Sequence, residues 1–145
     1  MTSGPIIAQI VGLRQRRPAR ESSNLHELAE NEVQLPDFVR QSPAAMRYLR
    51  LLGPLAWDRF PERDLTLGWP VNAVPYAALA AAYLIKLDQG LATVSALRRY
   101  LVEQPALVWL CGFRLVSARR NPWGFDADAS LPTARHMTRM LRTMP

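Results

Sequence analysis

Cysteine and lysine are nearly absent from this chain of 145 residues. Cys111 is its one cysteine, so no disulfide can form within the chain, and a reducing, cytoplasmic setting is expected. The thiol lies in an apolar run, which predicts a small buried residue rather than a nucleophile. Lys86 is the one lysine, so arginine supplies almost all of the positive charge.

Long apolar runs and alternating β patterns are missing as well. The longest uncharged apolar stretch, residues 71–85, contains Asn72 and Pro75 and is shorter than the ~20 residues of a membrane span. The apolar residues 6–13 precede the nearby arginines, unlike the order in a secretory signal. We expect a soluble protein without a membrane partner. Because apolar residues recur at helical spacing, we predict an all-α fold.

Patterns typical of catalytic and metal sites are also lacking. His26 and His136 lie far apart in the sequence, without cysteines at metal-ligand spacing. Asp126 and Asp128 would point to opposite sides of an extended segment, so helix capping and loop solvation explain them better than a shared metal ion. There is no glycine-rich phosphate loop and no Gly-x-Ser-x-Gly motif. The sequence therefore predicts a binding protein without a cofactor rather than an enzyme.

Arginine and apolar residues are what the chain has in abundance. Lysine and arginine number 18 against 12 acidic residues, which gives a formal net charge of +6, and 49% of the residues are hydrophobic. A basic surplus favours an anionic partner, and the guanidinium fork binds phosphate at two points. The alternative is an arginine-rich codon usage combined with ordinary solubility.

The first 40 residues differ in composition from the rest. A basic cluster at residues 14–20 surrounds Pro18 and is followed by an acidic stretch, in which Ser23 or Asn24 can cap a short helix to about Val33. We interpret residues 1–40 as a flexible N-terminal arm, which either lies along DNA or is simply solvated. We expect residues 41–145 to form a compact helical domain of the DNA-binding type.

Capping and breaking residues delimit the helices of that domain. Ser42, Gly90 and Thr93 are the clearest of these signals. Residues 61–69 read as a connection, and residues 114–129 as a polar loop with a turn at Asn121 to Gly124. The predicted helices cover residues 43–52, 54–60, 75–89, 93–103 and 105–112, with a last helix from Ser130 or Thr133 to the C-terminus.

Helices 75–89 and 93–103, joined by a tight turn, form a helix-turn-helix-like pair. Arg98 and Arg99 would lie on the exposed part of its second helix, where Arg99 can also pair with Glu103. Trp123 can stack on a base or lie buried under its loop. We predict four supporting contacts to DNA phosphates: Arg98, Arg99, Arg119 and Arg120.

The last helix carries the strongest signal for a binding surface. Arg135, Arg139 and Arg142 are spaced i, i+4, i+7 and fall within about 60° of one another around a helix. Met137, Met140 and Leu141 lie on the opposite side. This layout suits a helix that docks on a core and faces phosphates or a DNA groove, although an ordinary amphipathic surface helix has the same spacing.

The order of elements from Val74 to Met144 resembles the N-terminal helical region of bacterial insertion-sequence transposases. The resemblance covers about half of the chain, and Met137 stands where an aromatic residue is common in the family. It rests on the long helix to Leu87, Gly90-Leu91, Leu97, Tyr100-Leu101, Pro105-Ala106-Leu107, Gly112, and Ser130-Leu131-Pro132-Thr133 before the arginine-rich helix.

The resemblance implies double-stranded DNA as the partner and recognition of element ends as the function. In that family a ribonuclease-H-like domain follows and holds two divalent metal ions for strand cleavage. Because this chain ends at Pro145, we expect it to bind DNA without cutting it, and expect the metal only in that further domain. The alternative is a helical interaction or dimerisation module, suggested by Trp57, Trp69 and Trp109.

Overall fold

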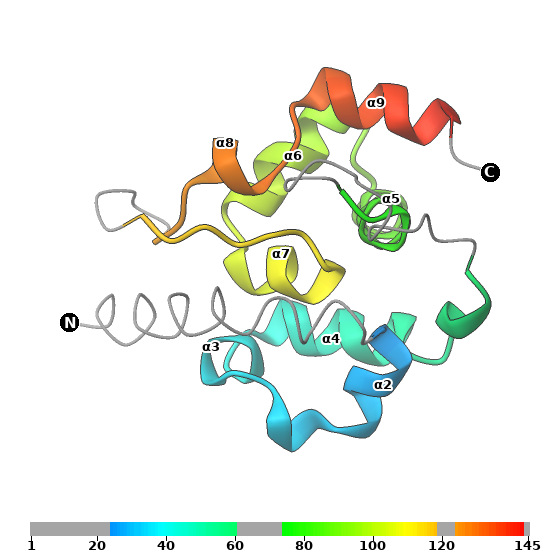
Figure 1. The fold of residues 1–145 in the computed structure, drawn as a ribbon, viewed down its shortest axis with the longest axis vertical. Helices are drawn as coiled ribbons and strands as arrows, with labels where there is room; N and C mark the ends of the chain where they lie inside the picture. Colours follow the sequence, from blue (N-terminus) through cyan, green and yellow to red (C-terminus); the bar gives the residue numbers. More distant parts are fainter. Residues whose placement is uncertain (1–23, 61–73, 119–123, 144–145) are drawn as a thin grey trace, which may run out of the picture.

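Helices make up most of the described part of the chain, which comprises residues 24–60, 74–118 and 124–143 of a computed structural model. The predicted all-α class is confirmed (Figure 1). None of the described helices is long and apolar enough to cross a lipid bilayer. The α-helices are α2 (Leu25–Glu30), α3 (Asp37–Arg40), α4 (Pro43–Leu52), α5 (Tyr76–Gln89), α6 (Val94–Val102), α7 (Pro105–Cys111), α8 (Ala127–Ser130) and α9 (Ala134–Thr143), and the 3-10 turns are η1 (Glu32–Gln34) and η2 (Trp57–Arg59).

Side-chain caps begin the helices where the sequence predicts them. The side-chain oxygens of Ser42 and Thr93 accept hydrogen bonds from backbone amides in the first turns of α4 and α6, each at 3.1 Å. Asn24, rather than Ser23, caps α2. Gly90 and Gly112 end α5 and α7 with φ of 67° and 110°, values that a residue with a Cβ rarely adopts.

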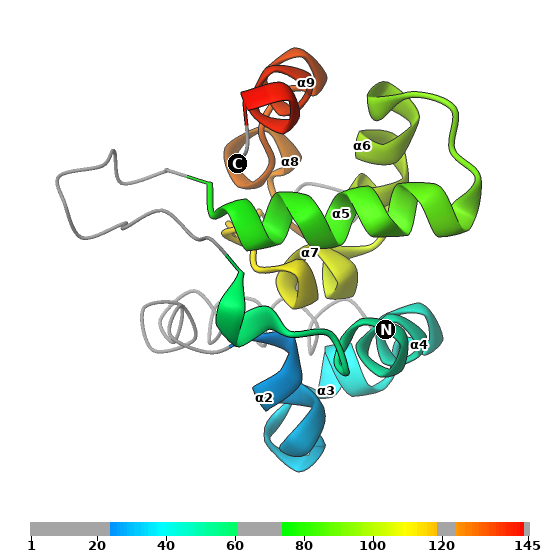
Figure 2. The ribbon, with the colours of Figure 1, turned by 90° about the vertical axis from the view of Figure 1, so that its right-hand side faces the viewer.

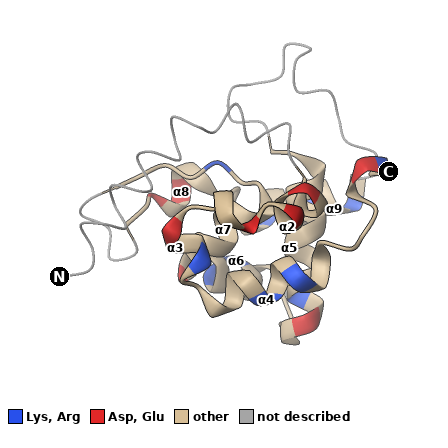
Figure 3. Ribbon diagram, turned by 90° about the horizontal axis from the view of Figure 1, so that it is seen from below, with Lys and Arg blue, Asp and Glu red and all other residues tan. Residues whose placement is uncertain are grey.

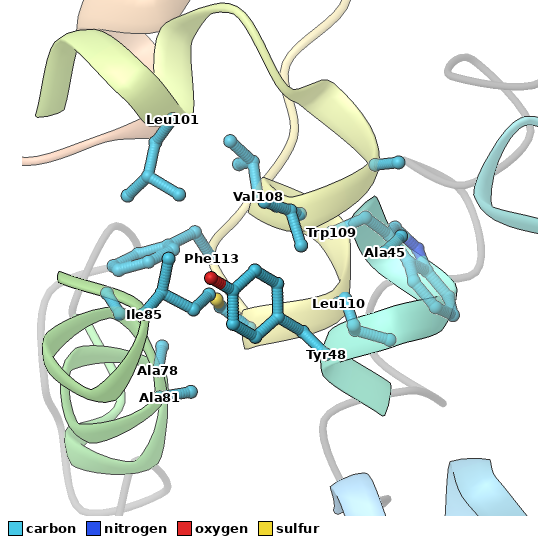
Figure 4. Close-up of a cluster of buried hydrophobic side chains, with 14 of the residues drawn as sticks. Ala45, Tyr48, Ala78, Ala81, Ile85, Leu101, Val108, Trp109, Leu110 and Phe113 are labelled. Carbon is cyan, nitrogen blue, oxygen red and sulfur yellow. The ribbon is translucent and has the colours of Figure 1, made fainter. Parts of the chain in front are cut away.

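The short helix α7 lies at the centre of the fold. It packs against α3 and α4 on one side and against α5 and α6 on the other, and all of its residues after Pro105 are buried. The ring of Tyr48 reaches from α4 toward the residues of α5, beside Leu110 of α7 (Figure 4). With α2 to α4 below and α5, α6 and α9 above, α7 forms the middle layer (Figure 2).

The region predicted as a polar loop, residues 114–129, is largely packed at its two ends. Leu115 and Phe125 are almost completely buried, as is Phe113 just before them. Ser117 and Phe125 form an isolated antiparallel bridge. The prediction of a polar loop was wrong at both ends of this region. Each end contains apolar residues that pack in the core, and the two ends pair with each other, whereas only the residues between them are strongly polar. The predicted turn at residues 121–124 lies mostly outside the described residues.

The segment at residues 24–40, assigned to an arm from the sequence, is helical where it is described. Leu25, Leu35, Phe38 and Val39 are buried in the common core, and α2 and α3 both pack on α4. The basic cluster at residues 14–20 lies outside the described residues, as does the predicted connection 61–69.

The helix predicted at residues 54–60 is a single 3-10 turn, η2. The indole Nε1 of Trp57 donates to the carbonyl of Leu52 at 2.7 Å and binds the turn back onto the end of α4. This local contact, between residues five apart, closes the chain onto α4 in place of a further regular helix.

Candidate functional site

Helix α9 divides its side chains between the core and the solvent. Met137 and Met140 are buried, and the helix packs against α5 and α6. Arg135, Arg139 and Arg142 are exposed. The predicted amphipathic layout of the last helix is therefore confirmed, and we call these three residues the arginine face.

Thr133 is the residue that begins α9. Its hydroxyl accepts a hydrogen bond from the amide of His136 at 3.1 Å. Ser130, the other predicted cap, is buried and instead accepts a hydrogen bond from the amide of Val116 at 2.9 Å. The two hydroxyls thus have separate roles, since Ser130 binds the end of α8 to the backbone at Val116 and Thr133 starts α9.

The arginine face lines a shallow hollow of about 730 Å³ along α9. Arg139 donates from Nη2 to Nδ1 of His136 at 2.9 Å, and because a guanidinium has no acceptor, that imidazole nitrogen is the acceptor. From Arg135 to Arg142 the helix rises about 10.5 Å, so the three cations form a row rather than a point charge. The lining residues are Thr133, Arg135, His136, Thr138, Arg139, Arg142 and Thr143.

The arginine face differs from the other described arginines in its lack of acidic partners. Helix α9 contains no acidic residue, and in the part of the chain that the structure describes none of its arginines forms an ion pair. On the side of α2 to α4, basic and acidic positions are interspersed (Figure 3). Other described arginines do form ion pairs: Arg40 with Asp37, Arg47 with Asp88, Arg50 with Glu32, and Arg98 with Asp128. The arginine face thus keeps its positive charge available for a partner.

The four predicted supporting arginines are not equivalent. Arg98 turns inward: its Nε donates to the carbonyl of Pro132 and its Nη2 to a carboxylate oxygen of Asp128, both at 2.9 Å. Arg99 is exposed on α6, and no ion pair joins it to Glu103. Arg119 and Arg120 lie outside the described residues, as does the neighbouring Trp123. The helix-turn-helix-like pair therefore presents one exposed arginine rather than two.

Two of the tryptophans that suggested an interaction surface belong to the core. Trp57 and Trp109 are buried, and Trp69 lies outside the described residues. Cys111 is buried, as predicted. Among the described residues there is no cluster of three or more histidine, cysteine or acidic side chains that could hold a metal ion.

A polar cluster between α4 and α5 was not anticipated from the sequence. Asp88 accepts hydrogen bonds from Arg47 and from the hydroxyl of Tyr48, at 2.7 and 2.6 Å. The bond from Arg47 holds the pKa of Asp88 below its usual value, whereas burial raises the pKa of Tyr48. Gln89 completes the cluster by donating to the Tyr48 hydroxyl at 2.7 Å. The cluster joins α4 to the end of α5 and leaves Arg47 neutralised.

Comparison with known proteins adds no functional assignment. No protein-family model, no curated protein and no solved structure matches this chain. The resemblance to insertion-sequence transposases therefore stays a prediction from the sequence, and the function has to be inferred from the surface itself.

Proposed function

We propose that this chain binds double-stranded DNA through the arginine face of α9. The observation that carries the proposal is a row of three exposed arginines, without an ion pair to any described residue, on a helix whose opposite side is fixed in the core by Met137 and Met140. Arginine side chains held in a row neutralise successive phosphates and release their counterions, which is the main source of affinity for DNA. The guanidinium fork can bind each phosphate at two points.

The position of α9 suits the approach of a duplex. The helix lies at the upper edge of the molecule in two perpendicular views (Figures 1 and 2). A helix with its side chains is about 10–12 Å across, and the major groove of B-DNA is about 12 Å wide. We propose that α9 lies on the phosphates or in the groove, with Arg99 on the neighbouring α6 as a supporting contact.

The resemblance to insertion-sequence transposases suggests a finer form of the proposal. In this finer form, the chain is the N-terminal part of a transposase that recognises the ends of a mobile element, and by itself it binds DNA without cleaving a strand. Specificity of this kind needs contacts to base edges, because phosphate contacts position a protein without reading the sequence.

The experiment that tests the proposal is a fluorescence-anisotropy titration of a labelled duplex at several salt concentrations. Wild-type affinity should fall steeply with salt, and Arg139→Ala should weaken binding and reduce the slope of log K against log salt by about 1. The control Arg59→Ala removes the same charge from η2, which packs on α2. If both variants weaken binding equally, DNA binding depends only on the net charge of the protein, and the proposed role of the arginine face is wrong.

A duplex carrying the terminal repeat of a neighbouring insertion element, compared with a scrambled duplex, tests the finer form. Tighter binding to the repeat near physiological salt supports recognition of element ends. Equal binding to both sequences refutes that form and leaves only general DNA binding.

A dimerisation module is the second candidate function. Tyr83 and Leu87 lie one turn apart on α5 and are 40% and 57% exposed. Isolated exposed apolar side chains are common on monomers, so this observation weighs less than the arginine face. Sedimentation at increasing concentration separates the two candidates, because a monomer at every concentration excludes the second.

A further inference from the structure

The side chain of Arg98 joins α6 to the segment that leads into α9. Its Nε binds the carbonyl of Pro132, the residue just before the cap of α9, and its Nη2 binds Asp128 in α8. The partners lie 34 and 30 positions further along the chain. One planar guanidinium therefore fixes two points of the same segment relative to α6.

These two hydrogen bonds leave Arg98 poorly placed to bind a phosphate. Its side chain is 21% exposed, whereas that of Asp128 is 95% exposed. The carboxylate offsets the positive charge, and two guanidinium donors are already occupied. Its neighbour Arg99 is exposed and has no ion pair among the described residues, so the two adjacent arginines provide a matched comparison.

We propose that Arg98 is a positioning residue, which together with Asp128 clamps the start of α9 and so determines where the arginine face points. This inference rests on the proposed function of α9. A positioning role differs from a direct role in binding, because Arg98 then contacts other parts of the protein rather than DNA. A clamp of this kind raises the fraction of molecules in the binding-competent arrangement.

For the variant Asp128→Ala, the clamp and simple electrostatics predict opposite changes in DNA affinity. Asp128→Ala removes a negative charge from α8, in the segment that leads into α9, so charge alone would tighten DNA binding. Loss of the clamp should instead weaken it, by about two- to threefold for so exposed a carboxylate. Asp58→Ala makes the same change of charge in η2 and measures the effect of charge alone.

A second variant preserves charge and changes geometry. In Arg98→Lys a single ammonium replaces the planar fork and cannot hold both partners in the same way. We expect affinity for a labelled mixed-sequence duplex of about two helical turns to fall roughly three- to tenfold. A phosphate contact should lose less affinity, since lysine also binds phosphate as a point charge, and it should leave the amide exchange of α9 unchanged.

Hydrogen exchange provides a readout that needs no DNA. The amide of Met137 donates to the carbonyl of Thr133 at 2.9 Å in the first turn of α9, and the amide of Val108 donates to Gln104 at 3.1 Å in α7. In Arg98→Lys, exchange at Met137 should accelerate relative to exchange at Val108. In the control Arg99→Lys, the ratio of the two rates should match that of the wild type.

The outcomes separate the two proposals. Faster exchange at Met137 together with weaker binding by both Arg98→Lys and Asp128→Ala supports the clamp. Unchanged exchange in Arg98→Lys, or tighter binding by Asp128→Ala than by Asp58→Ala, overturns it. If the wild-type chain shows no salt-dependent affinity for the duplex, the proposed function fails, and the exchange ratio still decides whether Arg98 holds α9.

Discussion

Helices α7 and α9 belong to one small fold but have opposite relations to the solvent. All residues of α7 after Pro105 are buried, and the helix contacts α3, α4, α5 and α6. Helix α9 contacts α5 and α6, buries Met137 and Met140, and presents its arginines to the solvent. Helix α7 thus joins the layers of the fold, whereas α9 packs on their surface.

The difference shows where each helix obtains its stability. A helix of seven residues does not form alone in water, so α7 depends on tertiary packing on all sides. Helix α9 depends on one apolar stripe and on contacts at its start. Changes on the exposed side of α9 should therefore alter binding without unfolding the protein, whereas changes in α7 should unfold it.

The largest expected effect is that of a cavity in α7. Leu107→Ala should lower the free energy of unfolding by about 2–5 kcal/mol, because Leu107 is fully buried and the core cannot close around the lost atoms. Leu87→Ala, at an exposed position of α5, should change it by less than about 0.5 kcal/mol. Urea denaturation measures both, and similar values would contradict the central role of α7.

The end of α7 should be the next most sensitive point. Gly112 has a φ of 110°, so Gly112→Ala should cost about 1–3 kcal/mol in backbone strain. Gly90→Ala provides the comparison at a φ of 67°, closer to the left-handed minimum and with open space around a new Cβ. Thermal unfolding should show the larger loss for Gly112→Ala, and the reverse order would show that α7 tolerates a shift of its last turn.

The start of α9 should respond locally rather than globally. Thr133→Ala removes the hydroxyl that accepts from the amide of His136 and should cost about 1 kcal/mol, while Thr133→Ser keeps the cap. Amide exchange should accelerate in α9 in the alanine variant and stay unchanged in α7. Equal acceleration in both helices would mean that α9 and the core unfold as one unit.

The smallest expected effect on stability is that of Asp88, and it should depend on pH. The hydrogen bond from Arg47 lowers the pKa of Asp88, so Asp88 adds stability above the ordinary carboxyl pKa of 3.8 and loses it as the pH falls through the lowered value. Asp88→Asn should therefore be less stable than the wild type at neutral pH, and the difference should shrink in acid.

Urea denaturation across the acid range measures this difference, with Asp58→Asn as the control for a carboxylate in η2. A difference between Asp88→Asn and the wild type that stays constant with pH would show that Asp88 acts through packing rather than through its charge.

Local signals account for the features that could be predicted. Ser42, Thr93 and Thr133 cap helices within three residues of themselves, and Gly90 and Gly112 end helices through their own backbone angles. Met137 and Arg139 lie on opposite sides of α9 because helical periodicity places them there. Each of these needs information from one turn of the chain.

Contacts between distant segments account for what was missed. The partners of Arg98 are 30 or more residues away, and Asp88 is bound by side chains 40 and 41 positions earlier. The sequence predicted Arg98 as a phosphate contact because its place on α6 is compatible with exposure. Its guanidinium forms hydrogen bonds within the protein only because the fold places α8 and Pro132 beside α6.

The amino-acid sequence by itself determined the all-α class, the limits of most helices and the amphipathic character of α9, because periodicity and capping act over a few residues. The tertiary structure decided which arginines keep a free positive charge and which are engaged by carboxylates and carbonyls. That choice depends on charges brought together from distant parts of the chain, since a guanidinium is neutralised by its neighbours in space.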